Sequence, residues 1–494
     1  MAWLTKSRFL SGLQCPRRLW LEVYEPLPPS PLIPGPVLEG RRVDALVRRL
    51  QPGIVIDRAP GLLSALEQTA NAFASGVPER VYQPAFQADE FAVIADIVEG
   101  HGRNVTLTEV KASTGVKDEH LPDVGFQILV VRRAGVAVDR IQLMHLNAEF
   151  VLQRVGDYEG LLHAADVTAE VEAKLPGIEE AARECMDVMA QAREPLIRTG
   201  PQCKAPYECP FTERCTLQEG GRAEYPVELL PYGAAVAKKL RRDGYADLRS
   251  VPIERLTSET HRRVHAATVS GEVFLDRTQA CSVAGLEYPI AYLDFETVAP
   301  AIPELLGTRA YQNLPFQFSV HIEDGPDVVR HVEYLANGAP LDLAELADSL
   351  VAAIPDGGAV LAYNSPFENG VLQDLAERVP RCAVALRDIA ERLVDLLPVT
   401  RKAYYHPAMK GSWSFKAVLP SLDPSLAYSE LEGVQEGLGA QLAFIEMVDP
   451  ATTRERREEL RVQLLKYCGR DTWGMVVLRR FLAGNGQHTA NASS

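Results

Sequence analysis

Three of the eight cysteines in this 494-residue chain stand within thirteen residues, in the segment CKAPYECPFTERC. Cys203, Cys209 and Cys215 are therefore spaced C-x5-C-x5-C. Thiolates held so close together repel one another unless they share a positive centre, which zinc or an iron–sulfur cluster provides. Such centres usually take four protein ligands, and Cys15, in LQCPRR, is the obvious candidate for the fourth. The paired C-x2-C knuckles of zinc ribbons are absent, but the spacing by itself leaves zinc, a cluster and unligated core cysteines open.

The composition is typical of a globular protein, with 47% hydrophobic and 24% charged residues. No apolar run approaches the roughly 20 residues that a membrane span needs, and the N-terminal segment lacks the apolar core of a secretory signal. We therefore expect a cytoplasmic protein that does not interact with membranes. Since disulfides are rare in that compartment, we interpret the other cysteines as packing residues: Cys185, Cys281, Cys382 and Cys468.

The net charge of −15 argues against a protein that coats nucleic acid non-specifically. It does not exclude a nuclease, because catalytic magnesium sites are built from carboxylates and a basic track can be local. Residues 1–50 and residues 236–265 are both locally basic, each with eight Lys and Arg against four Asp and Glu. Two solvated helix faces explain these segments at least as well.

The order of apolar runs and turn signals predicts an α/β protein with two catalytic modules. In the first module, strands are expected at 80–86, 90–99, 104–113 and 139–153, and helices at 38–50, 124–135 and 167–193. In the second, strands are expected at 288–297, 316–323, 328–336 and 359–364, and helices at 341–354 and 453–482. The predicted domains are a nuclease module at 1–220, a helical connector at 221–284, an exonuclease module at 285–485 and a disordered tail at 486–494.

A first set of polar residues lies in ADIVEGHGRNVTLTEVKAS. Asp96 ends one hydrophobic strand, and Glu109 and Lys111 are two apart on the next, so this pair points to one face. An Asp and a Glu on neighbouring strands can hold Mg²⁺ or Mn²⁺, and a lysine beside them can orient or activate water. Gln127 follows on the next predicted helix. As an isolated pattern, E-x-K is more often a surface ion pair.

The order of these residues resembles the RecB branch of the PD-(D/E)xK nuclease superfamily, including CRISPR-associated and AddB-type members. The resemblance implies a restriction-endonuclease-like fold in which Asp96, Glu109, Lys111 and Gln127 are catalytic and the first two hold the metal. One departure is Val131, which stands where the branch often has the tyrosine of Q-x-x-x-Y. The family often has a His or Glu on its first helix as well. For that position the sequence offers only a weak candidate, Glu39.

The same nucleases carry one cysteine near the N-terminus and three after the nuclease core, all on a [4Fe-4S] cluster that ties the two ends together. In this chain the cysteines bracket the acids in that order. The resemblance therefore implies a [4Fe-4S] cluster on Cys15, Cys203, Cys209 and Cys215.

A second set of acids is spread over the C-terminal half. Asp294 and Glu296 are two apart at the end of a strand in YLDFET, and Glu368 lies in the helix that AYNSPFENG opens. Tyr467 and Asp471, in KYCGRDTWG, are i and i+4 on one helix face. Four acids can thus converge on a pair of Mg²⁺ or Mn²⁺ ions, which suits phosphodiester hydrolysis with the ions about 3.5–4 Å apart. The tyrosine would orient the attacking water.

This pattern resembles the DEDD exonucleases of the RNase H-like fold, the DnaQ type, in the variant that closes with Y-x-x-x-D. The resemblance implies 3′–5′ exonuclease action by these five residues. Glu368 stands where most of the family has aspartate, and Asp374 and Asp395 are fallback ligands. As a whole, roughly residues 1–485 resemble a bacterial family that joins a RecB-like nuclease to such a domain.

Aromatic and basic residues alternate in RKAYYHPAMKGSWSFKAVLP, between the middle and last motifs. Such a segment can stack on single-stranded bases and hold phosphates. An ordered loop that packs on the core is an equally good interpretation. The residues concerned are Tyr404, Tyr405, His406, Lys410, Trp413 and Lys416.

Together these patterns predict a metal-dependent nuclease whose partner is nucleic acid, DNA rather than RNA, with a role in repair or defence. A first alternative is a catalytically weak or inactive iron–sulfur protein that binds nucleic acid. A second is an RNA exonuclease, because RNase H-like exonucleases accept either polymer and the 2′-hydroxyl contacts cannot be read from sequence. A zinc-stabilised hydrolase of small phosphoesters is a third. The sequence does not say which proteins, if any, are partners.

Overall fold

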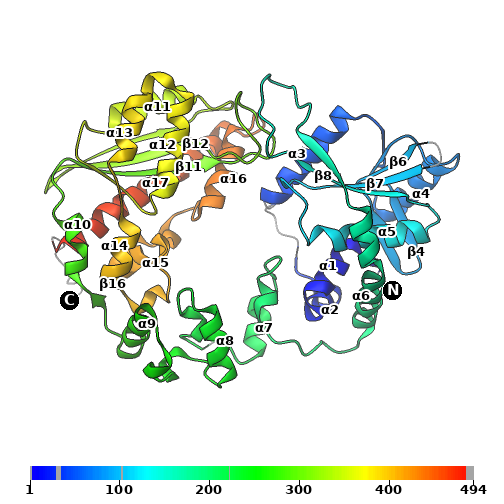
Figure 1. The fold of residues 1–494 in the computed structure, drawn as a ribbon, viewed down its shortest axis with the longest axis horizontal. Coiled ribbons are helices and arrows are strands. Elements are labelled where there is room, and N and C mark those ends of the chain that lie inside the picture. Colours follow the sequence, from blue (N-terminus) through cyan, green and yellow to red (C-terminus); the bar gives the residue numbers. More distant parts are fainter. Residues whose placement is uncertain (1–2, 29–34, 102–103, 222, 485–494) are drawn as a thin grey trace. The chain divides into compact units, whose positions relative to one another are not determined.

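The computed structural model describes residues 3–28, 35–101, 104–221 and 223–484, so the predicted tail at 486–494 lies outside the described residues. The chain divides into two compact units. Unit 1 comprises residues 1–221 and 300–312, and unit 2 comprises residues 222–299 and 313–494. Both units combine helices with mixed sheets, which confirms the predicted α/β class (Figure 1). Among the described helices, none combines the length and the apolar character needed to cross a membrane.

Unit 1 is built on a six-stranded sheet in the order β2-β3-β6-β7-β8-β9. Strands β7 and β8 are parallel, and helix α5 makes the crossover between them, as a parallel pair requires. Helix α5 is buried on nearly all sides, which explains its apolar sequence FQILVV. The sheet strands are β2 (Ile54–Val55), β3 (Val81–Tyr82), β6 (Ile97–His101), β7 (Asn104–Val110), β8 (Arg140–Leu146) and β9 (Leu162–Asp166).

A second, three-stranded sheet of unit 1 has the order β1-β5-β4. The sequence predicted single strands at 80–86 and 90–99, but each is divided between the two sheets. The breaks in the two predicted strands lie opposite each other. Gln83 N donates to Asp96 O at 2.9 Å, and Ala95 N donates to Pro84 O at 3.0 Å. Asp96 therefore lies at a bend between strands rather than at a strand end. The three strands are β1 (Leu4–Thr5), β4 (Ala85–Ala88) and β5 (Phe91–Ile94).

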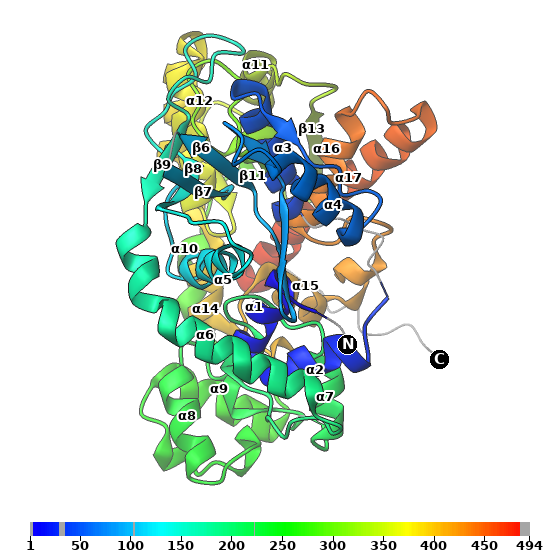
Figure 2. The same cartoon turned by 90° about the vertical axis from the view of Figure 1, so that its right-hand side faces the viewer.

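The beginning and the end of residues 1–221 meet around helices α1 and α2, which are separated by Cys15. Figure 2 shows them beside α6 and α7. The buried guanidinium of Arg17 joins these parts, since it donates to Glu194, Ile197 O, Gln218 and Glu219. The helices of unit 1 are α1 (Lys6–Gln14), α2 (Pro16–Tyr24), α3 (Gly35–Leu50), α4 (Leu62–Phe73), α5 (His120–Arg133), α6 (Thr168–Ala190) and α7 (Thr212–Gln218).

The segment 300–312 completes unit 1, although it lies between two strands of unit 2 in the sequence. Ala301 is fully buried in a core cluster with residues of α3 and β8. Ala301 N donates to Glu39 Oε2 at 2.9 Å, and the Tyr311 hydroxyl donates to Ala112 O.

Unit 2 contains a five-stranded sheet in the order β13-β12-β11-β14-β15. Strand β11 is antiparallel to β12 and parallel to β14, while β13 and β12 form the predicted hairpin. Helices α11, α12 and α13 cover one face of this sheet, and α17 crosses the other (Figure 1). The strands are β11 (Ile290–Val298), β12 (Leu314–Gly325), β13 (Val328–Leu335), β14 (Ala359–Ala362) and β15 (Leu393–Asp395), with a separate pair β10 (Phe274–Leu275) and β16 (Tyr404–Tyr405).

The segment predicted as a connector contains short helices and packs as part of unit 2. Its apolar residues share one core cluster with β11, β14 and α17. The helices of unit 2 are α8 (Ala234–Arg242), α9 (Glu259–Ser270), α10 (Cys281–Ala284), α11 (Leu343–Ala353), α12 (Pro366–Arg378), α13 (Ala383–Glu391), α14 (Leu396–Ala403), α15 (Phe415–Leu422), α16 (Gly437–Val448) and α17 (Arg454–Ala483).

Candidate functional site

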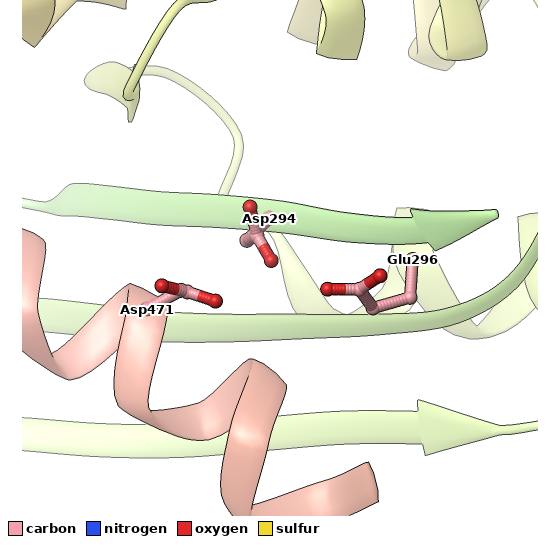
Figure 3. Close-up of side chains that lie close together, drawn as sticks. All are labelled: Asp294, Glu296 and Asp471. Atoms are coloured by element: carbon pink, nitrogen blue, oxygen red, sulfur yellow. The ribbon is translucent and has the colours of Figure 1, made fainter. Parts of the chain in front are cut away.

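Three carboxylates of unit 2 converge on one point. Asp294 and Glu296 are two apart on β11 and share its α17-facing side, and Asp471 comes from α17 itself. Figure 3 shows the three side chains turned toward one another. One oxygen of each lies within 4.8 Å of the others, and no other group of His, Cys, Asp or Glu in the described part of the chain meets that condition. Oxygen donors this close can serve as ligands of a hard divalent cation.

Glu368, from the first turn of α12, adds a fourth carboxylate. Its side chain is buried at 3% exposure, and its Oε2 has no hydrogen-bond partner among the described residues. It interacts electrostatically with Asp471 and Asp395. The fallback ligands have other partners: Asp374 pairs with Arg378 at 2.9 Å, and Asp395 accepts from the backbone of Leu397 and caps α14.

Burial and mutual repulsion both act on these carboxylates. Burial, together with the neighbouring acids, raises the pKa of Asp294 far above its usual range and raises that of Glu296 to about 8. Burial likewise raises the pKa of Glu368 to about 8 and that of Asp471 to about 7. No described residue forms an ion pair with any of the four. Several carboxylates held together without an ion pair repel one another, so the donor set fits a bound divalent cation.

Two tyrosines and a lysine border the carboxylates. Tyr467 is buried one turn before Asp471 on α17, and its ring centroid lies 5.8 Å from that of Tyr428. The Tyr428 hydroxyl donates to Asp471 Oδ1. Lys416 Nζ lies 5.1 Å from the Tyr428 ring centroid and 5.5 Å from that of Tyr467. The sequence analysis did not find Tyr428, because no local spacing links it to a residue 43 positions away.

The alternating aromatic segment is part of the core rather than a stacking surface. Tyr404, Tyr405 and Trp413 are each 5% exposed or less and belong to the cluster that joins the connector to α17. Trp413 Nε1 donates to Tyr404 O at 2.8 Å. The sequence pattern fitted both a stacking surface and a packed loop. The structure decides between them, because both residues of β16 are buried.

Unit 1 holds the second predicted site, around Glu109 on β7. Lys6 Nζ and Lys111 Nζ donate to Glu109 Oε1 at 2.8 and 2.7 Å, and Gln127 Nε2 donates to Oε2 at 2.8 Å. Lys111 also donates to Asp123 Oδ2 at 2.5 Å. The structure thus brings Glu109, Lys111 and Gln127 together and adds Lys6 and Asp123, which the sequence analysis missed. Asp123 and Gln127 are i and i+4 on α5, and that spacing was a usable signal.

Asp96 reaches the same site from its bend. Its Oδ2 accepts from Val110 N at 2.9 Å, so the carboxylate is held at the end of β7. It lines a small cavity together with Asp44, from helix α3. Asp44 is thus an acid of α3 beside Asp96. Glu39, the weak candidate on the same helix, has other partners, since its carboxylate accepts from Ala301 N and pairs with Arg42.

Lysines balance the charge of this site. Burial opposes ionisation of Glu109, but the ammonium groups of Lys6 and Lys111 outweigh it and lower its pKa. Burial also opposes the charge on Lys6 and Lys111, and the neighbouring carboxylates, Glu109 first, raise both pKa values. For Asp96, burial and then Glu109 raise the pKa well above its usual range. Two of the carboxylates are thus neutralised by the chain itself, unlike those of unit 2.

The four cysteines singled out in the sequence line one small cavity of unit 1. Cys15 lies between α1 and α2, Cys203 ends a short 3-10 turn, and Cys215 lies on α7. Cys209 N donates to Cys203 O at 2.8 Å, which fixes the loop between them. Burial raises the pKa of the Cys209 and Cys215 thiols. The structure thus brings together residues that are almost 200 positions apart.

Comparison with known protein families gives a match to part of the chain. Residues 291–414 match the family described as "Domain of unknown function (DUF2779)". The matched segment holds Asp294, Glu296 and Glu368 and ends before α17 supplies Asp471. No curated protein matches the chain.

Proposed function

We propose that this protein is a Mg²⁺- or Mn²⁺-dependent nuclease, and that unit 2 removes nucleotides from the 3′ end of a DNA strand. The observation that carries the proposal is a set of four neighbouring carboxylates, none of which forms an ion pair with a described residue: Asp294, Glu296, Glu368 and Asp471. The strand order β13-β12-β11-β14-β15, with β11 central, supports an RNase H-like fold of the DnaQ type. The acids come from the first strand, a middle helix and the last helix of that arrangement.

Each residue then has a role that its position allows. The four carboxylates hold the ions, and Tyr428 fixes Asp471 through its hydroxyl. Tyr467 presents its own hydroxyl beside the acids and orients the attacking water. Bound ions supply Lewis-acid stabilisation of the phosphoryl oxygens and a water of lowered pKa. Lys416 lies over both tyrosine rings, where it contributes positive charge near the phosphate.

For unit 1 we propose a PD-(D/E)xK nuclease site of the RecB type. Asp96 and Glu109 would hold a metal ion, with Asp44 beside Asp96, while Lys111 and Gln127 position water and the scissile phosphate. The order of strands β6, β7 and β8, with α5 as the crossover, supports this fold. The site is the weaker candidate for catalysis because Lys6 and Lys111 already neutralise two of its acids.

We further propose that Cys15, Cys203, Cys209 and Cys215 hold a [4Fe-4S] cluster. The four residues line one cavity, and in the sequence one precedes and three follow the proposed nuclease core, as in the nucleases that this half of the chain resembles. Binding would also ionise thiols that burial otherwise keeps protonated.

The deciding experiment is a nuclease assay on anaerobically purified protein with Mn²⁺. Single-stranded DNA and RNA of one sequence carry the label at the 5′ end. We expect wild type to produce a ladder of shortened DNA, Asp294→Asn to abolish the ladder, and Glu109→Gln to leave it. Asp374→Asn is the matched control, because this residue lies on α12 but pairs with Arg378.

Other outcomes point elsewhere. A ladder from RNA but not DNA selects the RNA exonuclease. Intact strands in the presence of folded, iron-containing protein overturn the catalytic proposal and favour a nucleic-acid-binding protein. Activity that survives in the Asp294→Asn, Glu109→Gln double variant contradicts both proposed sites.

A further inference from the structure

Unit 2 contains a groove of about 640 Å³ beside the proposed active site. This volume falls within the roughly 300–1,000 Å³ range of small-ligand pockets. One wall is the connector segment 228–232, and the other is the loop 410–415 with Arg401 of α14. The groove reaches Tyr363 and Asn364, which lead into α12 and Glu368, and Phe415, which precedes Lys416. It is therefore built from the same elements that carry the carboxylate site.

An exposed aromatic ring stands at the groove. The Tyr232 side chain is 89% exposed, and its backbone has a φ of 55°, in the left-handed region that non-glycine residues rarely adopt. Its neighbour Pro231 is fixed, because the Pro231 carbonyl lies 2.9 Å from His261 Nε2. The fold thus holds a large apolar ring in solvent at the expense of backbone strain, which is a feature of ligand-binding sites.

The groove contains two cations, Arg401 and Lys410. The Arg401 guanidinium lies 5.6 Å from the Tyr232 ring centroid, and its buried Nε has no hydrogen-bond partner among the described residues. Within the same part of the chain, neither Arg401 nor Lys410 forms an ion pair. The one acid of the groove, Glu228, is bound by Arg241 at 2.8 Å. In a chain of net charge −15, this groove is locally positive.

The loop that carries Lys410 is rigid. Gly411 has a φ of 76°, and a Cβ added there would lie 1.7 Å from Leu229 O, so the two walls meet in a contact that only glycine permits. Gly411 N donates to the Tyr405 hydroxyl at 3.0 Å, and the Tyr363 hydroxyl donates to Trp413 O at 2.6 Å. The buried aromatics of this segment therefore serve as the scaffold of the groove.

We propose that this groove binds the single-stranded nucleic acid that leads to the cleavage site, with a base stacked on Tyr232 and phosphates at Arg401 and Lys410. The inference rests on the proposed function of unit 2. An aromatic face takes any unpaired base, and free cations beside it track the backbone. A duplex fits less well, because its bases are already stacked on one another. The proposed preference is therefore for single strands without sequence selectivity.

The test is binding of a 5′-fluorescein oligothymidylate to the full-length protein, measured by anisotropy with excess chelator so that no strand is cut. We expect Tyr232→Ala to weaken binding by about ten-fold or more and Tyr232→Phe to preserve it, because stacking needs only the ring. Arg401→Met should weaken binding and lower the slope of log affinity against log salt by about 0.7, the value for one phosphate contact. Lys402→Met is the matched control, since Lys402 is the exposed neighbour of Arg401 outside the groove.

The outcomes separate this inference from the proposed function. If wild type binds and shortens DNA while Tyr232→Ala and Arg401→Met bind as wild type does, the groove is not the strand site although the nuclease stands. If wild type binds no oligonucleotide, the groove proposal is overturned. If the Tyr232→Ala and Arg401→Met variants lose as much affinity for duplex DNA as for single strands, the single-strand preference is overturned. If binding follows the expected pattern but nothing is cut with Mn²⁺, the groove proposal holds and the catalytic one fails.

Discussion

Glu368 carries a buried carboxylate oxygen that nothing in the described chain satisfies. Glu368→Gln should raise the melting temperature of the metal-free protein, because it removes one of four repelling acids. The same change should reduce both the stabilisation by Mn²⁺ and, by about 100-fold or more, the Mn²⁺-dependent shortening of DNA. Melting curves with and without Mn²⁺, combined with the ladder assay, provide the measurement. Unchanged Mn²⁺ stabilisation would remove Glu368 from the ligand set.

The stability of the metal-free protein should depend on pH through the same acids. Glu296 and Glu368 have a pKa raised to about 8 and Asp471 to about 7, against values near 4 in an unfolded chain. The folded state therefore binds more protons, so the contribution to stability is full below about pH 4 and is lost as the pH rises toward about 8. Melting temperatures across this window should fall, and Mn²⁺ should reduce the fall. A flat profile without metal would contradict the proposed repulsion.

At the scale of single residues, the sequence could predict what local spacing controls. Asp294 and Glu296 share a strand face because they are two apart, and Tyr467 precedes Asp471 by one helical turn. Tyr428 could not be found in this way, since its contact with Asp471 depends on tertiary packing. Of the two lysines that contact Glu109, the sequence could indicate only one for the same reason. Lys111 is two residues from Glu109, whereas Lys6 is 103 positions away.

At the scale of elements, Gly411 determines how the connector meets the loop of unit 2. Gly411→Ala should destabilise unit 2 by about 2–4 kcal/mol, from its positive φ and from overpacking against Leu229 O. Gly370→Ala is the matched control, because Gly370 lies on the exposed side of α12 and an added Cβ meets nothing within 4 Å. It should stabilise by up to about 1 kcal/mol. Urea unfolding followed by tryptophan fluorescence compares the two, and equal midpoints would contradict the close contact.

The order of elements was predictable, whereas their division between sheets was not. Periodicity indicated the long helices at 167–193 and 453–482, which the structure has as α6 and α17. The apolar run at 90–99 gave no sign of the bend at Asp96, because both halves are equally suited to a strand. That bend follows from hydrogen bonds to the facing segment at Gln83 and Pro84, and such partners are not encoded locally.

At the scale of the whole molecule, the proposed cluster would join the start of unit 1 to its end. Cys209→Ser should lower the iron and sulfide content and make the segment after α6 sensitive to protease, because one of four ligands is lost. Cys281→Ser should leave both unchanged, since Cys281 is exposed and belongs to unit 2. Chemical analysis of iron, sulfide and zinc measures the result. Stoichiometric zinc without iron would contradict the cluster and show that the cysteines bind a single ion.

Residues 300–312 belong to unit 1, although residues of unit 2 flank them in the sequence, and this limits how the chain can be divided. A fragment ending at residue 221 lacks the piece that contributes Ala301 to its own core, and the remainder of the chain carries that piece away. No single cut therefore releases unit 1 complete. Recombination that exchanges whole modules at one junction would therefore remove part of the core of unit 1.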